Sequence, residues 1–119
     1  MSEEKLKLKV EFFKTSNGKE PVKEWLNEFS KDDKLEIGSD IKAVQKGYPL
    51  VGMPLVESLG RGLYQVRSHI SQKRITRIIF YVENGKMILL HGFIKKTRKT
   101  PQNELDLAYK RYKELRGNE

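Results

Sequence analysis

Residues that support several common kinds of chemistry are scarce or absent in this sequence. Its 119 residues include no cysteine and only two histidines. The lack of cysteine excludes disulfide bonds, thiolate metal sites and a nucleophilic thiol. Two histidines without clustered carboxylates also disfavour a zinc site. We therefore expect a protein that uses neither a bound metal nor a cofactor.

Long apolar runs and the common catalytic motifs are missing as well. No apolar run approaches the roughly 20 residues of a membrane span, and residues 1–13, MSEEKLKLKVEFF, lack the apolar region of a signal peptide. We expect a cytoplasmic protein without a membrane partner. The sequence has no glycine-rich nucleotide loop, no GxSxG and no carboxylate triplet for two metal ions. A nuclease on this chain would use basic side chains instead of metal, with the 2′-hydroxyl of RNA as nucleophile.

Acidic residues are scarce in the second half of the chain. Residues 1–60 hold ten Lys and Arg against eleven Asp and Glu, whereas residues 61–119 hold fourteen against five. The formal net charge of +8 therefore belongs to the C-terminal half. Such asymmetry favours a nucleic-acid partner, because Lys and Arg neutralise phosphates. A basic surface that serves only solubility is the alternative.

The hydrophobic pattern predicts one α+β domain over residues 1–119, with element order β-α-α-β-β-β-α. Period-two alternation predicts strands at Lys5–Lys14, Leu63–His69, Arg74–Glu83 and Lys86–Ile94. The last three should form an antiparallel meander, with Asn84-Gly85 as a hairpin turn. The first predicted helix begins at Pro21 and ends near Ser30, and the second is capped by Asp32 or Asp33 and ends at Gly47 in a left-handed cap. The third is predicted to have Thr100 as its N-cap and Pro101 at its first position. Residues 48–62, rich in Pro and Gly, should form a long loop.

Two arginines lie in strands that are otherwise hydrophobic. The period-two rule places Arg77 on one face with Ile79 and Tyr81, and we expect Arg67 to face the same way. A guanidinium in mid-strand must be exposed or paired. The pattern leaves two interpretations open: the solvent face of a one-sided sheet, or a phosphate-binding face.

Further basic and polar residues surround these arginines in the sequence. Lys95, Lys96, Arg98 and Lys99 leave the last strand and form either a solvated loop or the second side of a phosphate site. His91 is either a structural histidine or a proton-transfer group. Gly92 either admits a partner or a nucleotide closely or marks a bulge. We expect RNA contacts from the following residues: Gln65, Arg74, Arg98, Lys99 and Tyr81, the last by base stacking.

Several strings resemble the HigB-like, phage-derived toxins of the RelE/ParE superfamily. They are EPVKEWL at residues 20–26, GLYQVR at 62–67, RIIFY at 77–81, LLHGFIKKT at 89–97 and KTP at 99–101. The resemblance implies a RelE-like fold, in which a small twisted antiparallel sheet carries a helical hairpin on one face and leaves an open, basic face opposite.

The same resemblance implies an activity and partners. Such toxins cleave mRNA, generally on the ribosome, and are held inactive by a small antitoxin that often carries a helix-turn-helix. The active residues carried over by position are Arg67, Arg77, Lys95 and Lys96, to which we add His91 for proton transfer. Two alternatives remain: a ParE-like toxin that poisons DNA gyrase without cleaving RNA, and a non-catalytic basic module that binds an acidic protein segment.

Overall fold

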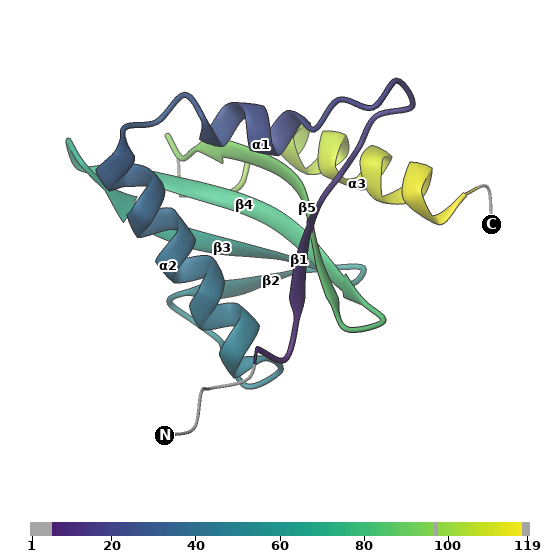
Figure 1. Ribbon diagram of the computed structural model, residues 1–119, viewed down its shortest axis with the longest axis horizontal. Helices are drawn as coiled ribbons and strands as arrows, with labels where there is room; N and C mark the ends of the chain where they lie inside the picture. Colours follow the sequence, from purple (N-terminus) through teal and green to yellow (C-terminus); the bar gives the residue numbers. More distant parts are fainter. Residues whose placement is uncertain (1–5, 97, 118–119) are drawn as a thin grey trace.

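A five-stranded sheet lies at the centre of the molecule, between two groups of helices (Figure 1). The computed structural model describes residues 6–96 and 98–117. The elements in chain order are β1 (Lys9–Phe12), α1 (Pro21–Leu26), α2 (Lys31–Gly47), β2 (Val56–Gly60), β3 (Leu63–Ile70), β4 (Arg74–Glu83), β5 (Lys86–Ile94) and α3 (Gln102–Arg116). The α+β class is confirmed. None of the helices in these ranges is both long and apolar enough to cross a membrane.

The strand order is β1-β5-β4-β3-β2, and β2 to β5 pair as an antiparallel meander. β4 and β5 have the predicted bounds, because Asn84 and Gly85 both adopt the positive φ of a two-residue hairpin turn. β1 is shorter than predicted, and Lys5 lies outside the described residues. β1 also pairs with β5 in parallel, so the prediction of a wholly antiparallel sheet was wrong. Parallel neighbours need a long connection, and here it consists of all the elements between β1 and β5.

The prediction of an unbroken loop over residues 48–62 was wrong, because Val56–Gly60 forms β2. Val56 pairs with Val66 and Glu57 with Gln65, and the register shifts between Ser58 and Gly60. Two of the three glycines in this range belong to the turn into β3, where φ is positive at Gly60 and Gly62. β2 brings Glu57 beside the middle of β3.

Three predicted helix ends differ from those observed. α1 ends at Leu26, before the expected end near Ser30. Ser30 caps α2 in place of Asp32 or Asp33, and its side chain accepts a hydrogen bond from the Asp33 N–H at 3.2 Å. Gly47 is the last residue of α2 but has no positive φ. A Cβ on Gly47 would overlap the Val51 side chain, so glycine leaves room for the chain that turns back.

Both faces of the sheet are covered by helices. Alternation along β4 directs Ile78 and Phe80 into a core with α1 and α2, and directs Ile79 and Tyr81 into a second core with α3. The helical hairpin on one face is therefore observed, but the expected open face opposite carries α3. Burying each of these large side chains stabilises the fold by roughly 1.5–3 kcal/mol.

Gly92 lies against Trp25 of α1, where a Cβ would overlap the indole ring. The close approach that the sequence suggested for a partner or nucleotide is thus made by a residue of the chain itself. This contact packs α1 against β5.

Candidate functional site

Three basic residues come together from neighbouring strands at one end of the sheet. Arg67 on β3 is the direct cross-strand partner of Arg77 on β4. Lys95 follows β5 and is held there by its backbone N–H, which donates to the Ile75 carbonyl at 2.7 Å. The proximity of Arg67, Arg77 and Lys95 rests on this register, since residues opposite each other on adjacent strands share a face.

Arg77 is buried, with a relative exposure of 1%. Its Nη1 donates to Thr100 Oγ1 at 3.0 Å and its Nη2 donates to the Arg98 carbonyl at 3.4 Å. Nη1 also lies 3.8 Å from Glu57 Oε1. Desolvation by burial, followed by the Arg67 cation, lowers the Arg77 pKa, while Glu57 opposes the shift. The sequence left two interpretations of Arg77 open, a solvent face and a phosphate-binding face. Neither is complete, because this guanidinium is paired inside the protein and is not exposed to solvent.

A chain of hydrogen bonds continues from Arg77 to β2. The Thr100 hydroxyl donates to Gln65 Oε1 at 3.0 Å, and Gln65 Nε2 donates to Glu57 Oε1 at 2.7 Å. Gln65 is fully buried, so its role is to connect Thr100 and Glu57, and it has no surface for an RNA contact. The Thr100 hydroxyl is occupied in this chain, and Pro101 takes the predicted N-cap position of Thr100 at the start of α3.

The segment after β5 carries the accessible cations. Lys95 is half-buried, while Lys96, Arg98 and Lys99 are exposed, and Thr97 lies outside the described residues. Desolvation, the Arg77 and Arg67 cations and then Arg98 lower the Lys95 pKa, against the opposing effect of Glu57. Like charges held this close favour the binding of an anion, which would offset their repulsion.

Comparison with known proteins places the chain in a family. Residues 24–113 match the family described as Phage derived protein Gp49-like (DUF891). The chain belongs to this Gp49-like family. It is a toxin-like (RelE/HigB-type) family of toxin–antitoxin systems, which implies an antitoxin partner. No curated protein matches the sequence.

His91 of this Gp49-like protein contacts α3. Its Nε2 lies 2.6 Å from Glu104 Oε1, and its ring stacks on Phe93 with 5.7 Å between centroids. The side chain is 14% exposed. The contact ties β5 to the first turn of α3, which fits a structural role and also holds the imidazole in one orientation.

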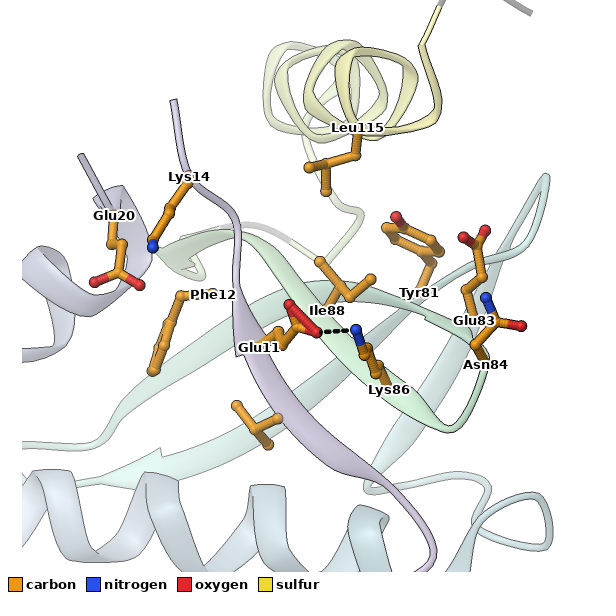
Figure 2. Close-up of a pocket in the computed structure, with 11 residues that line it drawn as sticks. Glu11, Phe12, Lys14, Glu20, Tyr81, Glu83, Asn84, Lys86, Ile88 and Leu115 are labelled. Carbon is orange, nitrogen blue, oxygen red and sulfur yellow. Dashed lines mark ion pairs between the residues drawn. The ribbon is translucent and has the colours of Figure 1, made fainter. Parts of the chain in front are cut away.

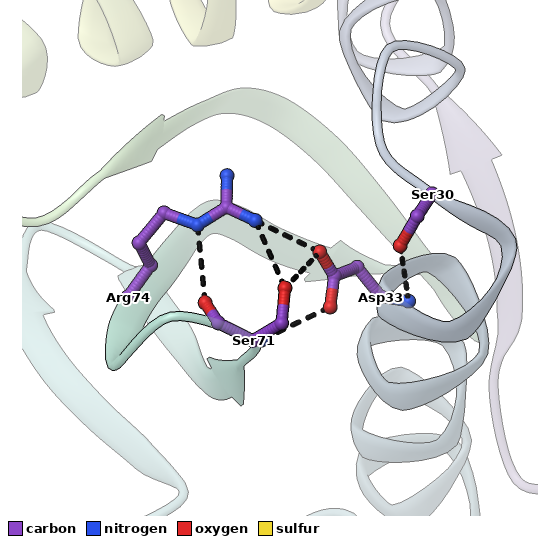
Figure 3. Close-up of polar contacts among 4 residues, drawn as sticks. All are labelled: Ser30, Asp33, Ser71 and Arg74. Carbon is purple, nitrogen blue, oxygen red and sulfur yellow. Dashed lines mark hydrogen bonds and ion pairs between the residues drawn. The ribbon is translucent and has the colours of Figure 1, made fainter.

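Two residues that the sequence assigned to RNA contact lie away from the basic cluster of the Gp49-like protein. Tyr81 is buried under α3, where its ring meets Tyr112 edge to face at 4.7 Å, and burial raises its pKa. The residue is only 4% exposed, which leaves little of the ring for a base to stack on. Arg74 donates from Nη2 to Asp33 Oδ2 at 2.9 Å and from Nε to the Ser71 carbonyl (Figure 3). It joins the β3–β4 turn to α2.

Glu57 and the hydrogen bonds of Thr100 with Arg77 and Gln65 were not predicted from the sequence. Glu57 fell within the predicted loop, although it is the only acidic residue between Asp40 and Glu83. That isolation in a basic stretch was a signal that could have singled it out. Thr100 was understood only as a helix cap.

A separate hollow of about 580 Å³ lies between β1, β5 and the end of α3 (Figure 2). Glu11 and Lys86 form an ion pair of 2.9 Å in its wall, and Leu115 faces it from α3. Its lining alternates acidic, basic and apolar side chains. It therefore lacks the concentrated positive charge that a phosphate backbone needs.

Proposed function

We propose that this protein is the HigB-like toxin of a type II toxin–antitoxin system and that it cleaves mRNA without a metal ion. The observation that carries the proposal is the convergence of Arg67, Arg77 and Lys95 from three neighbouring strands. Family membership supports the toxin assignment. The antitoxin would be a small protein, expected to carry a helix-turn-helix, and the mRNA would be bound to the ribosome in the cytoplasm.

The three cations differ in burial and would therefore act on the scissile phosphate in different ways. Arg67 and Lys95 are partly exposed and would contact the phosphate directly. The buried Arg77 would position them through its charge and through its hydrogen bond to the Arg98 carbonyl. Preorganised positive groups stabilise the charge that develops at phosphorus in the transition state. Lys96, Arg98 and Lys99 would hold the neighbouring phosphates and fix the register of the strand.

Proton transfer to the leaving 5′ oxygen would come from Lys95. Its lowered pKa makes the ammonium a better proton donor than an ordinary lysine. His91 is the second group that we propose for proton transfer, with its imidazole held by Glu104.

Induced expression in a bacterial host tests this function. Wild type is expected to arrest growth and fragment mRNA, and Arg67→Ala should do neither. Lys73→Ala is the matched control, since it removes an exposed cation from the β3–β4 turn outside the cluster. If wild type and Arg67→Ala arrest growth equally and leave mRNA intact, the nuclease proposal is wrong. DNA damage with intact transcripts would select gyrase poisoning instead.

A further inference from the structure

A carboxylate lies inside the basic cluster. Glu57 projects from β2 with its side chain 39% exposed, and its Oε1 lies 3.8 Å from Arg77 Nη1. Arg77 on β4 and Lys95 after β5 interact with it electrostatically, and Arg67 lies two residues along β3 from its cross-strand partner Gln65. An acidic residue in a site for a polyanion opposes binding, so its presence needs a reason other than affinity.

We infer that Glu57 is the proton acceptor for the attacking 2′-hydroxyl of RNA. The inference rests on the proposed function and assigns one step of it. A general base must be fixed in place and must keep an oxygen available to the substrate. Glu57 Oε1 is held by the fully buried Gln65, and Oε2 accepts no hydrogen bond from any residue within 6–96 or 98–117. With 39% of the side chain exposed, RNA can reach the carboxylate.

The reaction balances without any further reactant. The 2′-hydroxyl gives its proton to the Glu57 carboxylate, and the 2′ oxygen forms a bond to phosphorus. The bond between phosphorus and the 5′ oxygen breaks, and the leaving oxygen takes a proton from Lys95. The products are a 2′,3′-cyclic phosphate and a 5′-hydroxyl. The proton on Glu57 then returns to Lys95 through solvent, which restores both groups.

A structural role for Glu57 makes a different prediction. A carboxylate that only neutralises the buried Arg77 would matter for folding, and its removal would leave a more positive site. RNA would then bind as tightly or more tightly, and cleavage would persist in the folded protein. A proton acceptor also leaves binding intact when neutralised, but its loss removes cleavage. The separation between affinity and rate therefore decides between the two roles.

The test is single-turnover cleavage by Glu57→Gln of an mRNA on programmed ribosomes, with affinity measured in parallel. The amide can still accept the hydrogen bond from Gln65, so the local structure is retained. We expect the rate to fall by roughly 10²–10⁴-fold, the span of general acid–base catalysis, with affinity unchanged or tighter. Glu57→Asp should recover part of the rate. Glu11→Gln is the matched control, because Glu11 is an exposed, ion-paired carboxylate far along the sheet.

A second measurement applies even if Glu57→Gln does not fold. The wild-type rate should rise with pH over the acidic range with a slope near one, as a base loses its proton, and Glu57→Asp should keep this slope. Equal cleavage rates for folded Glu57→Gln and wild type would overturn the assignment of Glu57 but not the proposed function. A wild-type rate that stays constant over the acidic pH range would do the same. No cleavage by wild type under any condition would overturn the proposed function and this inference together.

Discussion

Arg67 and Arg77 lie directly opposite each other on β3 and β4, two like charges at one cross-strand position. Such a pair destabilises a sheet by roughly 0.2–1 kcal/mol relative to neutral residues. The Nε atoms of both arginines are buried and have no hydrogen-bond partner among the residues that the structure describes. This arrangement lowers the stability of the sheet and concentrates positive charge at one place, which is typical of binding and catalytic sites.

Neutralising Arg67 should therefore stabilise the protein while it inactivates it. We expect Arg67→Gln to raise the free energy of unfolding by about 0.5 kcal/mol, because the repulsion with Arg77 is relieved. mRNA cleavage by the same variant should be lost. Chemical denaturation and a cleavage assay on one preparation measure both effects. Lower stability of Arg67→Gln would contradict the proposed electrostatic strain.

Removing Arg77 should have the opposite effect on stability. Arg77→Ala takes away the donor to Thr100 and the Arg98 carbonyl and leaves a buried cavity. We expect a loss of about 3 kcal/mol of unfolding free energy. Arg77→Lys should recover little of it, since a single ammonium cannot reach both acceptors. Denaturation curves that overlay for wild type and Arg77→Ala would show that this network does not hold α3 to the sheet.

Lys95 should control the alkaline side of the pH–rate profile. Its pKa is lowered, so the ammonium loses its proton at a lower pH than an ordinary lysine, and the rate should fall as the pH rises through that value. Lys95→Arg keeps the charge but donates a proton poorly, so we expect a rate about 100-fold lower with affinity retained. Lys73→Arg, in the exposed β3–β4 turn outside the cluster, is the control and should behave as wild type. An unchanged alkaline limb in Lys95→Arg would exclude Lys95 as the proton donor.

The contact between α2 and the β3–β4 turn should depend on pH through Asp33. The backbone hydrogen bond from Ser71 is the main cause that lowers the Asp33 pKa below its ordinary 3.8, and Arg74 adds to it. The folded protein thus binds this proton less readily than the unfolded chain. The stabilisation is present above pH 3.8 and is lost as the pH falls through the lowered value. Asp33→Asn should reduce the melting temperature near neutral pH and reduce it less in acid.

Asp32→Asn is the matched control for that experiment. Asp32 lies in the same first turn of α2 and is exposed. Thermal melts between pH 2.5 and 7 should show little difference between Asp32→Asn and wild type. A gap between Asp33→Asn and wild type that stays constant down to pH 2.5 would contradict the assignment to the charged carboxylate.

Two glycines should respond in opposite directions to the same substitution. Gly92→Ala pushes a Cβ into the Trp25 indole, and we expect a loss of roughly 1–3 kcal/mol from overpacking. Gly38→Ala in the middle of α2 meets no atom within 4 Å and should stabilise the protein by roughly 0.5–1 kcal/mol. A melting temperature of Gly92→Ala at or above that of wild type would contradict the packing of α1 on β5.

The sequence predicted the elements whose signals are local. β4 and β5 have the expected bounds because alternation runs up to the Asn84-Gly85 turn on both sides. β2 was missed because five residues flanked by turn-forming glycines show too little alternation to stand out from a loop. The parallel pairing of β1 could not be predicted, because the residues of a strand do not identify the distant strand with which it pairs.

The site was predictable as a set of cations but not as a structure. Alternation placed Arg77 on the correct face, yet its burial depends on Thr100, Arg98 and the β2 residue Glu57, which are far from it in sequence. Arg74 and Tyr81 were assigned to RNA because basic and aromatic residues are common in such sites. Their partners Asp33 and Tyr112 belong to helices that the pattern could not position over the sheet.

The products at the cleaved bond distinguish metal-free cleavage through the RNA 2′-hydroxyl from hydrolysis by water. The purified protein is incubated with programmed ribosomes, the cleavage site is mapped, and the mRNA is remade with a single 2′-deoxynucleotide at that site. We predict that the all-ribose mRNA yields a 2′,3′-cyclic phosphate and a 5′-hydroxyl, and that the 2′-deoxy substitution abolishes cleavage. Equal cleavage of both mRNAs, leaving a 3′-hydroxyl and a 5′-phosphate, would contradict it.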